Sequence, residues 1–304
     1  MKGLAFSALY FLFLTTSLWA QDKSVEELFQ EASSAELQYE DLREPAVEEL
    51  VHRGEEAVPY LVGRLGTRDA RERHALENIL KRIKEPAVEP LIEALKTNDR
   101  WALSLGIRIL GLIGDKRALP PLLELSSHPN WRVRSTVAFS LGRIGENTAT
   151  PWLIFALEDS VDLVRKSAAV SLGELKDPRA MPQLLQALFD SFYGVRYSAA
   201  GALAKLGSSA IDSLICILQV PSDKRRYLAI EALGEIGDQA AIKSIIPLLD
   251  DADWATRAFA AQAIGRLRGK EGIEALIFAQ RKERHPYALL QIRETLKNLA
   301  SFDR

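Results

Sequence analysis

The chain has 304 residues, of which 39 are Lys or Arg and 41 are Asp or Glu, and 47% of its residues are hydrophobic. This composition is typical of a folded protein, and it excludes intrinsic disorder and a protein with many membrane spans. The formal net charge of −2 gives no electrostatic reason to expect nucleic-acid binding, and a single Cys excludes an internal disulfide.

Residues 1–20 have the pattern of a secretory signal peptide. Lys2 supplies the positive charge, a mostly apolar run extends from Leu4 to Leu14, and a segment of small and polar residues ends at Ala20. We expect cleavage after Ala20 and a mature protein that is exported, either periplasmic or secreted, with no stable membrane insertion. The alternative is an uncleaved membrane anchor, but the apolar run is shorter than the about 20 residues that span a bilayer.

Residues 21–56 predict a pair of helices whose sequence differs from the rest of the chain. The two helices are expected around Ser24–Phe29 and Pro45–Val51. Their acidic and less regular sequence is typical of an N-terminal cap, which a stack of repeats needs to cover the end of its core.

Residues 57–304 contain about eight repeats of about 31 residues each. Three columns of residues recur at this period. The first is small, the second is Arg, and the third is Leu or Ile. The small column is Ala57, Ala87, Ala118, Ala149, Ala180, Ala210, Ala241 and Gly272. The Arg column is Arg73, Arg134, Arg165, Arg196, Arg226 and Arg257. The Leu or Ile column is Leu80, Leu110, Leu141, Leu172, Leu203, Leu233 and Ile264.

Each repeat predicts two antiparallel helices, a shorter first helix and a longer second helix. In one second helix, Val164, Ala168, Leu172 and Leu175 follow the i, i+4, i+8, i+11 spacing of one helical face. A helix pair of this size cannot bury its apolar face alone, so neighbouring pairs must stack. The sequence therefore predicts an all-α superhelix of stacked helix pairs.

The segments 163–173 and 226–238 resemble HEAT repeats, and in particular the short repeats of the phycobilisome-lyase-like group. The resemblance covers nearly all of the chain after residue 20 and implies an armadillo-type α–α superhelix. It implies little about function, because the group includes scaffolds, pigment lyases and hydroxylases.

The Arg column has acidic residues at a fixed distance. An Asp precedes Arg165, Arg196 and Arg257 by six residues. In HEAT repeats this spacing resembles a ladder of hydrogen bonds within and between repeats, each worth about 1.5–3 kcal/mol. We therefore expect a structural ladder, and not a phosphate-binding surface, from Arg134, Arg165, Arg196, Arg226 and Arg257 with Asp159, Asp190 and Asp251.

Another column, nine residues after the Arg column, alternates in charge. It contains Arg143, Glu174, Lys205, Glu235 and Arg266. We expect opposite charges in neighbouring repeats to pair at the surface, with a stabilisation of a few tenths of a kcal/mol for each pair.

The sequence contains no motif typical of catalysis or metal binding. HEAT-like hydroxylases hold iron with His-Glu dipeptides, but none of the four His residues here is followed by Glu. The spacings typical of zinc sites are also absent. We expect no catalytic residue, no metal and no cofactor, and we expect Cys216 to be buried in a first helix. A lyase or hydroxylase activity is the alternative, although the resembling lyases work in the cytoplasm.

Aromatic residues of the second helices are the candidates for binding a partner. In the resembling superhelices the second helices line the concave groove. We therefore predict a non-enzymatic scaffold that binds a protein or peptide through Phe139, Tyr197, Tyr227, Trp131, Tyr193 and Trp254. The alternative is that these rings fill gaps between repeats. A second candidate is an apolar patch on the first helices, formed by Tyr60, Leu91, Leu122 and Trp152.

Overall fold

The computed structural model describes residues 23–220 and 225–302, so the predicted signal peptide lies outside the described residues. These residues form α-helices and short 3₁₀ turns, and no strand occurs among them. The all-α prediction is confirmed. The chain divides into two compact units, of which the first ends at Glu146 and the second begins at Asn147. In the described ranges, no helix is both long enough and apolar enough to span a bilayer.

The first unit contains the predicted N-terminal pair and three repeats. The N-terminal pair is α2 (Val25–Ser33) and α3 (Arg43–Arg53). The repeats are the pairs α4 (Val58–Gly63) and α5 (Ala70–Ile83), α6 (Val88–Ala94) and α7 (Arg100–Ile113), and α8 (Leu119–Glu124) and α9 (Trp131–Ile144).

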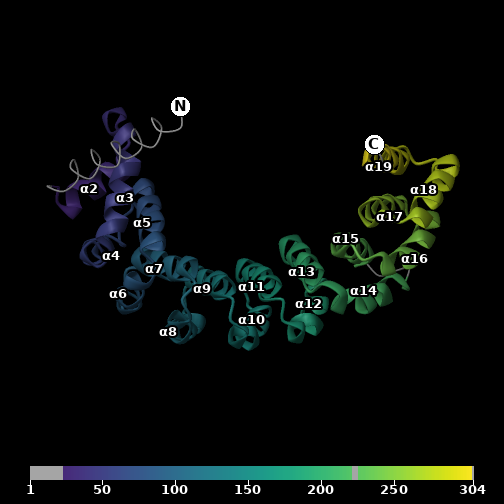
Figure 1. Cartoon of the computed structure of the whole chain (residues 1–304). Helices are drawn as coiled ribbons and strands as arrows, with labels where there is room; N and C mark the ends of the chain where they lie inside the picture. The colour runs from purple at the N-terminus through teal and green to yellow at the C-terminus, as the bar shows by residue number, and fades with distance from the viewer. Residues whose placement is uncertain (1–22, 221–224, 303–304) are drawn as a thin grey trace, which may run out of the picture. The chain divides into compact units, whose positions relative to one another are not determined.

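The second unit contains five repeats. They are the pairs α10 (Thr150–Ala156) and α11 (Asp162–Leu175), α12 (Met181–Ala187) and α13 (Tyr193–Lys205), α14 (Ile211–Leu218) and α15 (Arg226–Ile236), α16 (Ile242–Ile245) and α17 (Trp254–Leu267), and α18 (Lys270–Lys282) and α19 (Pro286–Phe302). A 3₁₀ turn, Ile246–Asp250, extends α16. In this unit the first helices form one layer and the second helices form another, and the second helices lie on the inner side of its curve (Figure 1).

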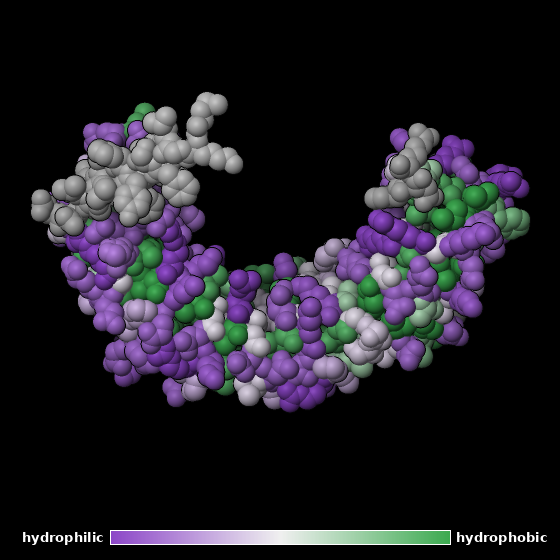
Figure 2. All heavy atoms as spheres, viewed as in Figure 1, coloured by the Kyte–Doolittle hydropathy of each residue, from purple (hydrophilic) through white to green (hydrophobic). Residues whose placement is uncertain are grey.

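The repeat columns form the core of both units. Every residue of the Leu or Ile column from Leu80 to Ile264, and every Ala of the small column from Ala57 to Ala241, is 0% exposed. The Ala residues of the small column lie in, or directly after, the 3₁₀ turn that precedes the first helix, where a larger side chain would push the first helix away from the second. On the face shown in Figure 2, hydrophilic residues cover most of the surface and hydrophobic residues are visible among them.

Neighbouring second helices approach closely at glycine. In the first unit, a Cβ atom added to Gly111 of α7 would lie 2.6 Å from Cβ of Ser140 in α9. Ser140 is itself fully buried, and its hydroxyl donates a 2.9 Å hydrogen bond to the carbonyl of Ile107. In the second unit, Gly173 of α11 has the same role, because its added Cβ would lie 2.9 Å from Cα of Ala202.

Two expectations from the sequence were wrong. Leu91 and Leu122 are fully buried, so they do not form an apolar surface patch with Tyr60 and Trp152. The reason is register: Leu91 and Leu122 follow the small column by four residues and face the core, whereas Tyr60 and Trp152 follow it by three residues. Cys216 does lie in a first helix, α14, but its side chain is exposed, because Leu214, Ile217 and Leu218 form the buried face of that helix.

Candidate binding surface

Exposed aromatic rings lie on three consecutive second helices of the second unit. Tyr193 and Tyr197 of α13 are 61% and 48% exposed, and Tyr227 of α15 and Trp254 of α17 are each 40% exposed. All four were predicted from their positions in the repeat. We call these four residues, together with Phe259 and Tyr287, the aromatic face.

The rings of the aromatic face contact one another. Tyr193 and Tyr197 stack within α13, with ring centroids 6.1 Å apart. Tyr227 stacks on Phe259 of α17 at 5.9 Å, which joins two neighbouring repeats. The ring of Tyr227 therefore packs against the next repeat, as expected of a ring that fills a gap between repeats, and it is also partly exposed.

A smaller cluster closes the aromatic face near the end of the unit. Trp254 stacks on His285 with centroids 4.3 Å apart, and Tyr287 contacts the same indole edge-on at 5.5 Å. Tyr287 is 50% exposed. The sequence did not identify Phe259, His285 or Tyr287. Phe259 and Tyr287 lie one or two residues away from the aromatic columns, and His285 lies in the column of Trp254 but is not Phe, Tyr or Trp.

Two acidic residues of the second helices, Glu174 and Glu231, have contrasting surroundings. Nζ of Lys205 lies 2.6 Å from the carboxylate of Glu174, one repeat earlier, as the alternating column predicted. In α15, burial and then the nearby carboxylate of Glu235 raise the pKa of Glu231.

The Arg column bonds both within and between repeats. Nη1 of Arg165 donates to the carbonyl of Asp159 at 2.8 Å, within its own repeat. Nε and Nη2 of Arg165 donate to the two carboxylate oxygens of Asp190 in the next repeat, at 2.6 and 2.8 Å. The carboxylate of Asp190 also accepts a hydrogen bond from the backbone N–H of Phe192, which fixes the start of α13.

The other members of this column have related contacts. Arg134 and Arg196 donate to the carbonyls of His128 and Asp190, the residues six positions earlier, at 2.9 and 2.7 Å. Arg226 donates to the carboxylate of Asp251 at 2.7 Å. Arg165 and Arg226 therefore link neighbouring repeats, whereas these bonds of Arg134 and Arg196 lie within their own repeats.

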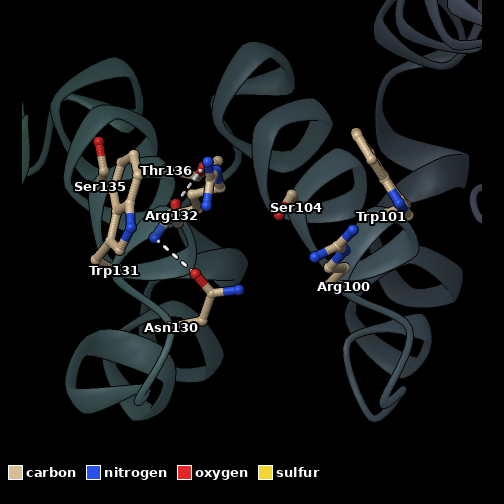
Figure 3. A pocket seen from close by; sticks show the side chains of 8 residues that line it. All are labelled: Arg100, Trp101, Ser104, Asn130, Trp131, Arg132, Ser135 and Thr136. Carbon is tan, nitrogen blue, oxygen red and sulfur yellow. Dashed lines mark hydrogen bonds between the residues drawn. The ribbon is translucent and has the colours of Figure 1, made fainter.

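The remaining two predicted residues lie in the first unit. Phe139 of α9 is 37% exposed. Trp131, also of α9, lines an open pocket of about 420 Å³ together with Trp101 of α7, which the sequence did not single out. The other lining residues are Arg100, Ser104, Asn130, Arg132, Ser135 and Thr136 (Figure 3).

The side chains of this pocket come from the first two turns of α7 and α9 and from Asn130, which directly precedes α9. In the view of Figure 3, the guanidinium groups of Arg100 and Arg132 lie between the two indole rings. Cζ of Arg132 lies 4.5 Å from the ring centroid of Trp131, and Cζ of Arg100 lies 5.5 Å from that of Trp101. Contacts of this kind hold a cation against the face of an aromatic ring.

Metal-ligating side chains do not gather in the part of the chain that the structure describes. Across residues 23–220 and 225–302, no group of three or more His, Cys, Asp or Glu side chains is placed to hold a metal ion. The candidate site is therefore described by its aromatic rings and arginines.

The sequence matches the model of the HEAT repeats family over residues 88–173, 150–227 and 211–297, which together span more than half of the chain. No curated protein is significantly similar to the sequence. Among solved structures, Kap95p in its complex with RanGDP has a TM-score of 0.58 and 14% identity, with 94% of this chain and 46% of Kap95p covered.

Two shorter solved structures are also similar. YibA of Escherichia coli has a TM-score of 0.52 and 20% identity, with 87% of this chain and 98% of YibA covered. The complex of CpcE and CpcF of phycocyanin lyase from Nostoc has a TM-score of 0.43 and 21% identity, with 79% of this chain and 93% of that chain covered. At such identities, the similarity to Kap95p and YibA shows a shared fold.

Proposed function

This chain belongs to the HEAT repeat family, and we propose that it is an exported, non-enzymatic scaffold that binds a protein or peptide partner along the second helices of its second unit. HEAT repeats commonly mediate protein binding. The observation that carries the proposal is the aromatic face, where exposed rings lie on the second helices of three consecutive repeats.

Aromatic side chains are favoured anchors at protein interfaces, because each buries a large area and loses little conformational entropy on binding. The contacts between Tyr227 and Phe259, and between Trp254 and Tyr287, hold these rings in place before a partner arrives. A partner would therefore meet a preorganised surface, which lowers the entropic cost of binding.

The absence of catalysis is supported by the sequence, in which none of the four His residues is followed by Glu. Export is supported by the signal-like pattern of residues 1–20. Mass spectrometry of the protein purified from its native cell tests export directly. A mature chain beginning at Gln21 in the envelope or secreted fraction would support it, and an intact N-terminus in the cytoplasm would contradict it.

Binding is tested by comparing a variant of the aromatic face with a control variant that lacks an exposed ring elsewhere in the same unit. Tyr197→Ala combined with Tyr227→Ala removes two rings of the aromatic face, whereas Phe155→Ala removes a 70% exposed ring from α10, a first helix of the same unit. Immobilised wild type and Phe155→Ala are expected to retain the same proteins from the native envelope fraction. The double variant is expected to lose them, while its helicity and melting temperature stay unchanged.

Equal retention by the double variant would contradict the assignment of the aromatic face. If Phe155→Ala instead lost the retained proteins, the binding surface would have to be assigned to the layer of first helices. We expect both variants to be folded in this experiment, because the three substituted side chains lie at the surface.

A further inference from the structure

We infer that the pocket between α7 and α9 in the first unit binds an acidic peptide segment, with a carboxylate of that segment held by Arg100 and Arg132. An apolar side chain of the same segment would lie against the indole rings of Trp101 and Trp131. This is a second site with its own ligand chemistry. It does not depend on the proposed function, because its residues belong to the first unit and the aromatic face belongs to the second.

The charge of the pocket selects an anion. None of its eight lining residues is acidic, and two of them are exposed arginines. The nearby carboxylate of Asp99 caps α7, where it accepts hydrogen bonds from the backbone N–H groups of Trp101 and Ala102 at 2.7 and 3.4 Å. Arginine binds carboxylates with two parallel hydrogen bonds, so a pair of arginines can hold one acidic side chain or two adjacent ones.

The tryptophans preorganise these arginines. Each guanidinium group lies over an indole ring, at 4.5 Å for Arg132 and 5.5 Å for Arg100. Cζ of Arg73 from α5 also lies 5.3 Å from the ring centroid of Trp101. An arginine held in this way loses less side-chain entropy when it binds a carboxylate, and Trp and Arg are both enriched at binding hot spots.

The dimensions of the site favour a peptide over a nucleic acid. A volume of about 420 Å³ accommodates a few side chains. Nucleic-acid binding instead requires many phosphate contacts along a basic track, whereas this pocket offers two arginines on a chain of net charge −2. The guanidinium groups also cover one face of each indole ring, which reduces the area open to base stacking.

The test measures the affinity of the whole mature protein for one defined probe. The probe is a fluorescein-labelled peptide of ten residues, eight Glu with two central Leu, and its anisotropy is followed at low ionic strength. A peptide with Lys in place of Glu is the charge control. We expect saturable binding of the acidic peptide, weakened by salt, and no saturable binding of the basic peptide.

Four variants assign the binding to the pocket. Arg100→Gln combined with Arg132→Gln is expected to raise Kd by about tenfold or more. Arg100→Lys combined with Arg132→Lys keeps the charge but loses the two-point contact, so its Kd is expected to lie between those of wild type and the Gln variant. Trp101→Ala is also expected to raise Kd. Arg143→Gln changes an exposed arginine of α9 that does not line the pocket, and is expected to leave Kd unchanged.

Circular dichroism checks that each variant is folded. The inference would be overturned by a Kd that changes less than twofold in the Gln variant, by equal binding of the basic peptide, or by no binding of the acidic peptide at millimolar concentration. Tighter binding of a ten-nucleotide single strand than of the acidic peptide would also overturn it. None of these results bears on the aromatic face, whose variants lie in the other unit.

Discussion

The guanidinium group of Arg257 in α17 binds both carboxylate oxygens of Glu283, which lies between α18 and α19. Nε donates to Oε2 at 2.6 Å and Nη2 donates to Oε1 at 2.9 Å. Only 3% of the Glu283 side chain is exposed. The hydrogen bond from Arg257, with further ones from the backbone of His285 and Arg284, lowers the pKa of Glu283 to about 2. This ion pair fastens the last repeat to the one before it.

A depressed carboxyl pKa makes this contact sensitive to acid. Glu283 contributes its full stabilisation above the unfolded-state pKa of about 4.3, and the contribution is lost as the pH falls towards the folded-state pKa. Glu283→Gln is expected to lower the free energy of unfolding at pH 7 by about 1.5–3 kcal/mol, and the difference from wild type should shrink between about pH 4.5 and pH 2. Urea unfolding at several pH values measures this. Glu271→Gln, at an exposed site of α18, is the control and should change the free energy by less than about 0.5 kcal/mol.

Arg165 is expected to stabilise the second unit much more than an exposed ion pair does. Its side chain is 14% exposed and Asp190 is 11% exposed, whereas Lys205 and Glu174 are each 46% exposed. Arg165→Ala is expected to lower the free energy of unfolding by about 1.5–3 kcal/mol, and Lys205→Ala by less than about 1 kcal/mol. Urea unfolding compares the two, and equal effects would show that the Arg165 pair is no stronger than a surface pair.

Two glycines of the second unit are expected to respond to Ala in opposite directions. At Gly173 the new Cβ would lie 2.9 Å from the backbone of Ala202, so Gly173→Ala should cost about 1–3 kcal/mol by forcing α11 and α13 apart. At Gly201 of α13 nothing lies within 4 Å of the new Cβ, so Gly201→Ala should stabilise the helix by about 0.5–1 kcal/mol. Thermal unfolding measures both, and a stabilising Gly173→Ala would contradict the close packing.

The exposed thiol of Cys216 is expected to react in the native state. With a disulfide reagent that releases a coloured thiolate, native protein should be modified about as fast as protein in urea, and one thiol should react per chain. The melting temperature should not change on modification, because Cys216 lies outside the buried face of α14. A thiol that reacts only in urea would show that this residue is protected.

The sequence was sufficient to predict the fold because its period is carried by residues that face the core. Ala87 and Leu110, for example, recur as fully buried positions in successive repeats. The pairing of Lys205 with Glu174 could also be predicted, since residues one period apart become neighbours in the stack. In a repeat protein, residues separated by one repeat length in the sequence lie next to each other in the stack.

Features that depart from the period could not be predicted. Glu283 takes the place of the Asp that precedes other second helices, but it lies one residue later, and its longer side chain restores the contact with Arg257. Phe259 and Trp101 likewise lie outside the aromatic columns, and their roles depend on how the neighbouring helix is packed. The exposure of a ring depends on the packing of neighbouring side chains, and the repeat pattern of the sequence does not specify that packing.

The buried arginine pairs have a mechanical consequence for the second unit. The pairs Arg165–Asp190, Arg226–Asp251 and Arg257–Glu283 all lie along the edge where first helices lead into second helices. The opposite edge, near the ends of α11 and α13, carries the exposed pair Lys205–Glu174 and a buried hydrogen bond that the hydroxyl of Thr150 donates to Asp177 at 2.8 Å. The three arginine pairs link successive repeats along one edge, so that edge should keep its spacing when the unit bends.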